Sequence, residues 1–474
     1  MAVSNSLAAR SMTGVIKLML DFGYALALSK AKSKARGATE EKAQIVRWRN
    51  IYGVTLIPWS LEYDFLLRRS PVYLRLTKES YESYYRKFFR VNGEASTVTT
   101  PSDEHFYRSI TNTGNSFYLR PTDRAGVEHM NMAQLMNVEL FPGYFFEVRG
   151  LEINHNTKEI LIITRHNRRI GKGDPSYEQA KIHAMTCVSY FNVGIGHSWV
   201  HFQLPCVVSA LVFNAVPRDS VLYRIMSVHT RFTMRINHQA LRIRRTSNNQ
   251  DKWSKRLNPF QAFAMTGNTF VENNQARTVD FYKLDGEFSA PPRLNPELPY
   301  HRFVGAYYQA IRQFIEDLGD RLELDLVDQL FTALDQYIPA SLAAFDRKDL
   351  LAAFIWQVSV LHSSDHHTYY KLFRNYSCPM LRHRLEDGEP IQPAAMFDPL
   401  NVAKFENFTD VFVKFSYEEK FPNNLAHLTY GFTDPDLQAI EGRFCAELKA
   451  VEAKLEQEGL ALVPLTQMAQ SICF

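Results

Sequence analysis

Two pairs of histidines have the spacing that lets side chains meet on one face of a helix. His362 and His366 lie four residues apart within Leu350–Tyr370, a stretch without Gly or Pro whose apolar residues recur at helical spacing. His197 and His201 form a second pair with the same spacing in the segment GHSWVH. Residues four apart project from the same side of a helix. Two such helices, packed together, can bring four imidazoles to one metal ion.

The histidine types and spacing leave several kinds of site open. Neither pair contains the Glu of HExxH, which zinc proteases use as a general base. A set of four imidazoles without thiolate suits Fe, Mn, Cu or Zn. A single helical pair also occurs in packed cores and on surfaces, and His367 adds a further histidine beside His366. A purely structural metal site is another reading of the same residues.

Composition indicates a globular protein with a sizeable core. Of 474 residues, 46% are apolar and 13% aromatic, and a net charge of +4 is too small to indicate nucleic-acid binding. The basic clusters at 165–172 and 241–245 read as solvated surface, or as groups that attract a substrate carboxylate. Five cysteines without a CxxC pair favour a reducing compartment, and we expect a cytoplasmic protein.

No uncharged apolar run is long enough to span a membrane. Residues 12–28 are apolar but interrupted by Lys17 and Asp21, which predicts an amphipathic helix. Such a helix usually docks on its own protein, and peripheral contact with a membrane surface is the alternative.

Hydrophobic periodicity predicts a mainly α protein with small β elements. We expect helical structure over residues 1–95, an irregular region over 91–142, and a β-hairpin from Phe145–Arg149 and Glu159–Arg165. A long helical region over 176–216 should bend at Pro205. The remaining predicted helices are 221–245, 301–318, 324–337, 347–372 and 434–458. The apolar tail 460–474 should pack into the core.

Three ordered segments resemble lipoxygenases. The first is Ser176–Asn237, with Ala180-Lys181, the pair His197 and His201, and VHTRFTMRIN, which is similar to the family's His-Tyr-Arg…Met-x-Ile-Asn segment. The second is IWQVSVLHSSDH, with Trp356 six residues before His362. The third is the end SICF, which resembles the family's Ser-Ile-x-Ile terminus, and 443–455 is similar to the penultimate helix.

The resemblance implies a large single lipoxygenase-like catalytic domain over 1–474, with an N-terminal helical and loop portion at 1–140 and a metal-binding helical core at 176–474. It implies non-haem iron, with manganese as the alternative. The implied ligands are four imidazoles and the terminal carboxylate, from His197, His201, His362, His366 and Phe474. A free α-carboxyl is ionised at neutral pH, because its pKa is about 3.3–3.7. A sixth octahedral position then remains for water or hydroxide.

Several positions depart from the family pattern. Plant and animal lipoxygenases have HxxxxH at the first pair, whereas the shorter spacing resembles fungal members, some of which use manganese. We expect regular α-helix to satisfy the shorter spacing without a widened turn. The fourth ligand, often Asn, is His366. The resemblance places Asn237 and Tyr369 next to the ligands, with Tyr369 replacing a Gln. Residues 1–140 lack the strands of the N-terminal lipid-binding barrel, which is typical of a short form.

The activity implied by the resemblance is insertion of O2 into a polyunsaturated fatty acid or similar 1,4-diene lipid. Hydroxide on the oxidised metal would take a hydrogen atom from the substrate, and O2 would add to give a hydroperoxide. Pocket walls would come from Leu204, Val208 and Phe213, and from Ala240, which resembles the residue of enzymes making S hydroperoxides. The alternatives are an oxidase acting on a natural-product intermediate, and a catalytically silent, metal-stabilised protein.

Overall fold

A computed structural model of the chain describes residues 100–137, 146–197, 200–201, 204–231, 233, 289–335, 342–373 and 423–472. Several predictions lie outside these residues: the helical structure over 1–95, the amphipathic stretch 12–28, the basic cluster 241–245, and the site residues Asn237, Ala240 and Phe474. Within the described parts, none of the helices combines the length and the apolarity that crossing a membrane requires.

Helices make up most of the described structure, as the hydrophobic periodicity predicted. Local signals explain where several of them begin. Ser220 accepts a hydrogen bond from Tyr223 N at the start of one helix, and Asp346 and Asp434 cap two others in the same way. The α-helices are α6 (Asp103–Thr111), α7 (Tyr177–Phe191), α9 (Pro205–Ala215), α10 (Val221–His229), α15 (Pro299–Asp317), α16 (Leu324–Asp335), α17 (Arg347–Trp356), α18 (His362–Phe373) and α20 (Pro435–Gln457).

Two π-helical turns and several short 3-10 turns connect these helices. The π turns are η3 (Asn192–His197), which continues α7, and η6 (Gln357–Leu361), which joins α17 to α18. Pro205 is the first residue of α9, where its missing N–H costs no helical hydrogen bond. Residues 202–203 lie outside the described part of the chain, so the bend predicted at Pro205 stays a prediction. The 3-10 turns are η1 (Gly114–Tyr118), η2 (Ala133–Asn137), η4 (Gly319–Arg321), η5 (Leu342–Ala344), η9 (Leu425–His427) and η10 (Leu465–Gln467).

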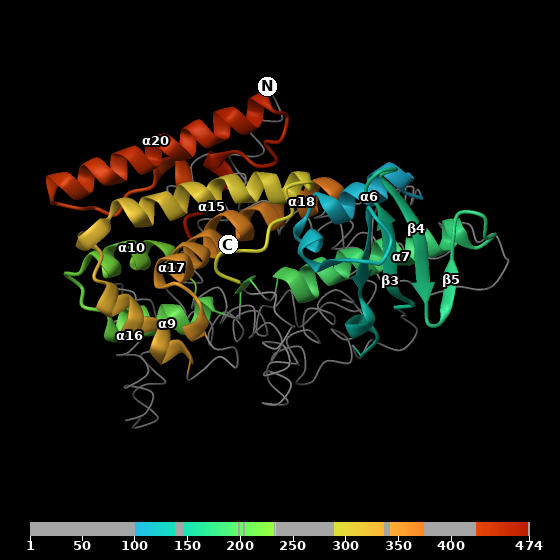
Figure 1. Cartoon of the computed structure of the whole chain (residues 1–474), viewed down its shortest axis with the longest axis horizontal. Coiled ribbons are helices and arrows are strands. Elements are labelled where there is room, and N and C mark those ends of the chain that lie inside the picture. The colour runs from blue at the N-terminus through green and yellow to red at the C-terminus, as the bar shows by residue number, and fades with distance from the viewer. Residues whose placement is uncertain are drawn as a thin grey trace, which may run out of the picture.

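A five-stranded antiparallel sheet with the strand order β1-β2-β3-β4-β5 lies at one end of the molecule (Figure 1). The predicted hairpin is confirmed as β3 and β4, although β3 begins three residues later than predicted and ends at Asn154. The region 91–142, predicted to be irregular, instead contains α6, β1 and β2. The strands are β1 (Leu119–Pro121), β2 (Val127–Asn131), β3 (Val148–Asn154), β4 (Glu159–Arg165) and β5 (Arg168–Ile170).

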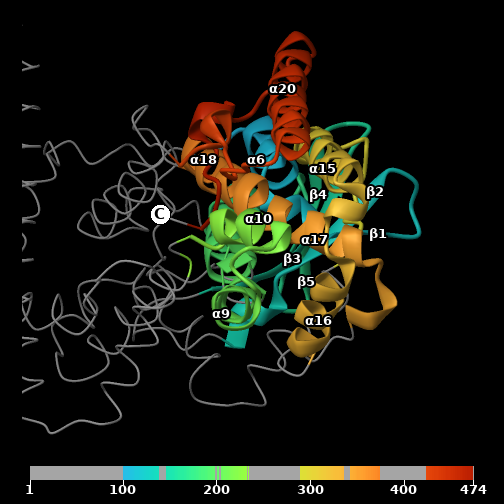
Figure 2. The same cartoon turned by 90° about the vertical axis from the view of Figure 1, so that its left-hand side faces the viewer.

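The core has two apolar clusters. One is helical: α15 packs against both α17 and α20, as the end-on view shows (Figure 2). Trp356 Nε1 donates a hydrogen bond to Val304 O at 2.8 Å, and Phe314 stacks on Phe444 with ring centroids 4.4 Å apart. The other cluster lies between the sheet and helices α6 and α7, and includes Leu151. This second cluster also takes in the end of α18, so α18 reaches from one cluster to the other.

The chain's C-terminal segment is packed into the core as far as Ile472, which confirms the predicted burial for the described residues. Leu465, Met468 and Ile472 are all buried in the helical cluster. Ala469 N donates to Ser363 Oγ at 2.9 Å, beside His362. A terminal segment normally frays unless it is tied down. Here both apolar burial and hydrogen bonds hold it against α18.

His229, the last residue of α10, also holds this segment. Its Nδ1 lies 2.7 Å from Gln470 O, and its Nε2 lies 2.9 Å from the Tyr430 hydroxyl. Because a carbonyl only accepts, Nδ1 carries the proton and donates it, so Nε2 accepts from Tyr430. The imidazole is fully buried, and burial lowers the pKa of His229 to about 4. His229 is therefore neutral at physiological pH.

This network predicts an acid-dependent loss of stability. The pKa of His229 is about 4 in the folded state and about 6.5 when unfolded, so between these values the unfolded chain binds more protons. The stabilisation is present above pH 6.5 and is lost as pH falls towards 4, by up to roughly 3 kcal/mol. We expect His229→Gln to be less stable at neutral pH and to show a shallower fall of Tm between pH 7 and 4.5.

Tyr430→Phe is the matched control for this measurement. It removes the hydroxyl that faces Nε2 but keeps the buried imidazole, so we expect a lower Tm with the acid-dependent fall retained. A His229→Gln protein whose Tm falls as steeply as that of the wild type would contradict the assignment.

Candidate metal centre

Each histidine pair begins where a π-helical turn ends. His197 is the last residue of η3, and His362 follows η6 as the first residue of α18. A π turn is wider than an α turn and contains one extra residue. The turn η3 ends at His197, and residues 198–199, between His197 and His201, lie outside the described part of the chain, so the expectation that the shorter spacing needs only regular α-helix stays a prediction. A widened turn is present at both pairs, on the N-terminal side of the first histidine.

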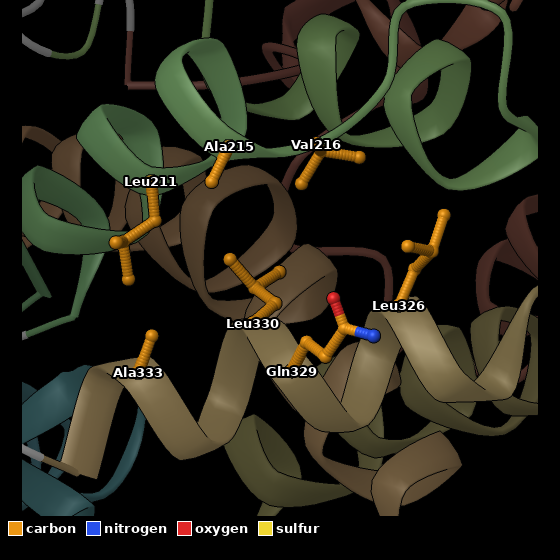
Figure 3. A pocket seen from close by; sticks show the side chains of 7 residues that line it. All are labelled: Leu211, Ala215, Val216, Leu326, Gln329, Leu330 and Ala333. Atoms are coloured by element: carbon orange, nitrogen blue, oxygen red, sulfur yellow. The ribbon is translucent and has the colours of Figure 1, made fainter.

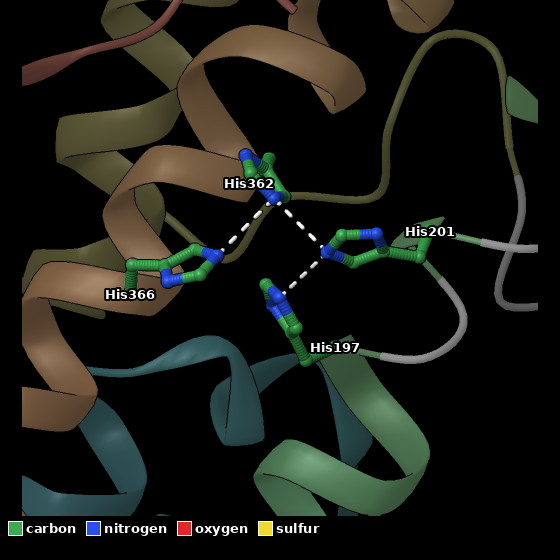
Figure 4. Close-up of side chains that lie close together, drawn as sticks. All are labelled: His197, His201, His362 and His366. Carbon is green, nitrogen blue, oxygen red and sulfur yellow. Dashed lines mark hydrogen bonds between the residues drawn. The ribbon is translucent and has the colours of Figure 1, made fainter. Parts of the chain in front are cut away.

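The structure brings all four histidines together, with their Nε2 atoms facing a common space (Figure 4). His201 Nε2 lies 2.9 Å from His197 Nε2 and 3.1 Å from His362 Nε2. His362 Nε2 lies 3.2 Å from His366 Nε2. All four side chains are buried, and one ligand atom from each falls within 4.8 Å of every other.

These distances fit a shared metal ion. With a metal–nitrogen bond of about 2.1 Å, ligand atoms at right angles are about 3.0 Å apart, whereas tetrahedral ligands are about 3.4 Å apart. The three separations of 2.9, 3.1 and 3.2 Å are close to this range. The four imidazoles could therefore hold one metal ion.

The electrostatics of the cluster also suit a cation. Burial, and then the neighbouring His201, lower the pKa of His197 well below its usual value. Burial, followed by His366 and the other histidines, does the same to His362. Both imidazoles are therefore neutral at physiological pH. A neutral imidazole offers a nitrogen lone pair, which is the form that ligates a metal.

The sequence-predicted pocket walls that the structure describes lie on or beside α9. Leu204 and Val208 are buried in the helical cluster. Phe213 is half-buried, with its ring edge-on to Tyr223 at a centroid distance of 6.1 Å. Their role in binding substrate stays a prediction.

A small apolar pocket lies further along α9, between it and α16 (Figure 3). Its empty volume, including the mouth to solvent, is about 290 Å³. The predicted walls Leu204, Val208 and Phe213 are not among its lining residues, which are Leu211, Ala215, Val216, Leu326, Gln329, Leu330 and Ala333.

Tyr369 connects the two helical segments that carry the histidines. Its hydroxyl lies 2.8 Å from Ser189 Oγ of α7, and its ring stacks on Phe373 at 4.8 Å. The side chain is fully buried in the cluster beneath the sheet. Tyr369 thereby ties α18 to the helix that leads into His197.

Asp365 is a site residue that sequence reasoning missed. Its Oδ2 lies 3.6 Å from His197 Nδ1, the ring nitrogen opposite the one that faces the other imidazoles. Burial raises the pKa of Asp365 to about 7, against the lowering effect of a hydrogen bond from Gly114 N–H. The signal that could have found it is an acidic residue between the two histidines of one pair, three residues after His362 and directly before His366.

Comparison with known proteins identifies the fold. No protein-family model matches the sequence, and no curated protein matches it significantly. Among solved structures, coral 8R-lipoxygenase matches with a TM-score of 0.61 at 13% identity, over 90% of this chain and 74% of that chain. The manganese lipoxygenase of Gaeumannomyces graminis matches with a TM-score of 0.57 at 13% identity, over 79% of this chain and 80% of that one.

A calcium-dependent 11R-lipoxygenase also matches, with a TM-score of 0.56 at 12% identity, over 91% of this chain and 72% of that chain. These identities are too low to transfer an activity, but the similarity extends over most of the chain. The resemblance inferred from the sequence motifs is therefore confirmed at the level of structure: this chain has the fold of the lipoxygenases.

Proposed function

We propose that this protein is a non-haem metal dioxygenase that inserts O2 into a polyunsaturated fatty acid or a similar 1,4-diene lipid. The observation that carries the proposal is the convergence of four buried imidazoles, from two helical segments, on one space within a lipoxygenase fold. Low identity leaves the substrate to experiment. A long apolar substrate that contains a 1,4-diene is the class we propose.

The proposed ligands are His197, His201, His362 and His366, completed by the terminal carboxylate of Phe474. The tethered C-terminal segment supports the fifth ligand, since Ile472 is buried two residues before the end of the chain. Ser471 Oγ donates to Arg231 O at 2.6 Å, and Ala469 N donates to Ser363 Oγ beside His362. These bonds hold Ala469 and Ser471, which precede Phe474 by five and three residues.

A bound iron ion, or manganese as the alternative, would supply one-electron redox chemistry. The chain's part is to hold the ion with neutral imidazoles and a single carboxylate, which leave it electron-poor. Such an ion favours removal of a hydrogen atom, because the electron and the proton leave the substrate together. Overall, a hydrogen atom leaves the doubly allylic carbon, O2 adds at one end of the delocalised radical as one double bond moves into conjugation, and the peroxyl group regains an electron and a proton. Both oxygen atoms of O2 are retained in the hydroperoxide, so no external reductant is needed.

Burial is the second contribution of the chain. All four imidazoles are buried, so water is largely kept away from a reactive substrate radical. We propose that Leu204, Val208, Phe213 and Ala240 line the substrate channel, because the first two begin the helical segment that follows His201. Asn237 and Tyr369 are proposed to support the ligands from behind. We propose a cytoplasmic location, with peripheral membrane contact as a route to lipid substrates.

The first prediction concerns metal and turnover. Protein made with iron and manganese available should contain about one equivalent of either metal. It should also form conjugated dienes from linoleate under air, which ultraviolet absorbance measures. His366→Gln should lose most of its bound metal and most of its diene-forming activity. His367→Gln is the matched control. His367 is a buried neighbour on the same helix, but its Nε2 lies 3.2 Å from Gln467 O and it is not one of the four proposed ligands.

Different outcomes separate the alternatives. Metal binding without activity on polyunsaturated lipids would favour a natural-product substrate or a silent structural site. Full occupancy by zinc in the presence of iron and manganese would contradict the redox proposal.

The second prediction concerns the terminal carboxylate. Deleting Phe474, or extending the chain with a C-terminal tag, moves the carboxylate and should abolish activity and weaken metal binding. Phe474→Ile keeps the carboxylate in place and should retain both, and an N-terminal tag controls for tagging itself. Metal content and diene formation are the measurements. A C-terminally tagged protein with full activity would overturn the five-ligand assignment.

A further inference from the structure

Asp365 lies behind one of the proposed ligands and contacts it from the opposite helical segment. It sits on α18, directly before His366, yet its carboxylate faces His197, which ends η3. Its Oδ2 is 3.6 Å from His197 Nδ1, while His197 Nε2 is 2.9 Å from His201 Nε2. The imidazole of His197 therefore has the carboxylate on one side and the other histidines on the other.

The carboxylate is itself held by two further elements. Gly114 N, at the start of η1, donates to Oδ1 at 3.2 Å. The Tyr300 hydroxyl of α15 lies 3.4 Å from the same oxygen and 2.9 Å from Ser364 Oγ. A Cβ atom at position 114 would lie only 2.2 Å from Oδ1. Only glycine lets η1 approach the carboxylate this closely.

This arrangement has a defined chemical consequence for the ligand. A carboxylate beside Nδ1 keeps the proton on that nitrogen and fixes the plane of the ring, so the lone pair of Nε2 points at the metal position. In its ionised form, which a cation among the four histidines would favour, the carboxylate also makes Nε2 more basic, because negative charge is placed behind the ring. The distance of 3.6 Å is a few tenths of an ångström beyond a hydrogen bond, so the carboxylate acts on the ring through its charge.

We propose that Asp365 is a positioning residue that orients His197 for metal binding, and that η1 and Tyr300 hold Asp365 in place for that role. This inference rests on the proposed function, because it assigns a role within the same metal site. It adds a buried anion, a glycine from a distant segment and a tyrosine from α15 to the set of residues that determine metal affinity.

A purely structural role for Asp365 is the competing explanation, since its contacts also fasten η1 and α15 to α18. Asp365→Asn separates the two. Asparagine keeps a carbonyl oxygen of the same shape for Gly114 N–H and Tyr300, so the structural contacts survive, but it removes the negative charge behind His197. Gly114→Ala does the reverse, because it keeps the charge and pushes the carboxylate out of position.

The experiment titrates metal-free protein with Mn²⁺ and follows free and bound ion by electron paramagnetic resonance, alongside the Tm of the metal-free protein. We expect the Kd of Asp365→Asn and Gly114→Ala to rise by roughly 10- to 100-fold. The spectrum of bound Mn²⁺ should also change, because the reoriented imidazole alters the symmetry of the ligand field. The metal-free Tm of Asp365→Asn should stay close to that of the wild type.

Thr368→Val is the matched control. Thr368 is buried on the same helix, and its hydroxyl bonds to Ser364 O within that helix, so its Kd and spectrum should equal those of the wild type. If Asp365→Asn binds Mn²⁺ with the Kd and the spectrum of the wild type, the positioning role is overturned and the proposed function stands. If Asp365→Asn does not fold, an unchanged Kd and spectrum in Gly114→Ala would overturn it equally. Failure of the wild type to bind Mn²⁺ or Fe²⁺ would overturn both proposals.

Discussion

Four imidazoles buried against one another are a demanding arrangement for a protein core. Each inward-facing nitrogen has a lone pair or a proton that must be matched, and a chain of imidazoles can match only some of them by sharing protons. The closest Nε2 pair is 2.9 Å apart, so the four rings crowd a single space. A cation at the centre satisfies every lone pair at once. The rest of the fold can be understood as what keeps these four nitrogens pointing inward.

The two π turns are the local device that achieves this. In an α-helix successive residues are about 100° apart around the axis, so one inserted residue turns everything that follows by about that amount. The extra residue in η6 allows residues of α17, such as Trp356, to remain in the helical core while His362 and His366 face the site. The turn η3 occupies the same place before His197. Each of the two segments thus has a π turn that ends at or directly before the first histidine of its pair.

The sequence predicted the long elements well, because long elements carry strong apolar periodicity and clear starts such as Asp346 and Asp434. It missed β1 and β2, which are too short and polar to show an alternating pattern. It could not reveal the π turns, because one extra residue in a helix cannot be recognised from a single sequence without knowing which residues face the core. The histidine spacing indicated a metal site, and motif resemblance supplied the pairing of the two helices. Asp365 was missed because its partner Gly114 is 251 positions away in the sequence.

The position of the histidines relative to the two core clusters explains how this fold tolerates so much sequence change. Helix α18 begins beside the helical cluster and ends, at Tyr369 and Phe373, in the cluster beneath the sheet. The turn η1 makes the same connection, with Phe117 packed on the helical cluster and Tyr118 on the other. The site therefore lies where both clusters meet and is held from both sides. Within each cluster an apolar residue can be exchanged for another of similar volume at modest cost. At the junction, an exchange would also have to keep buried polar groups paired, which costs more. The coral 8R-lipoxygenase structure, at 13% identity, shares the fold.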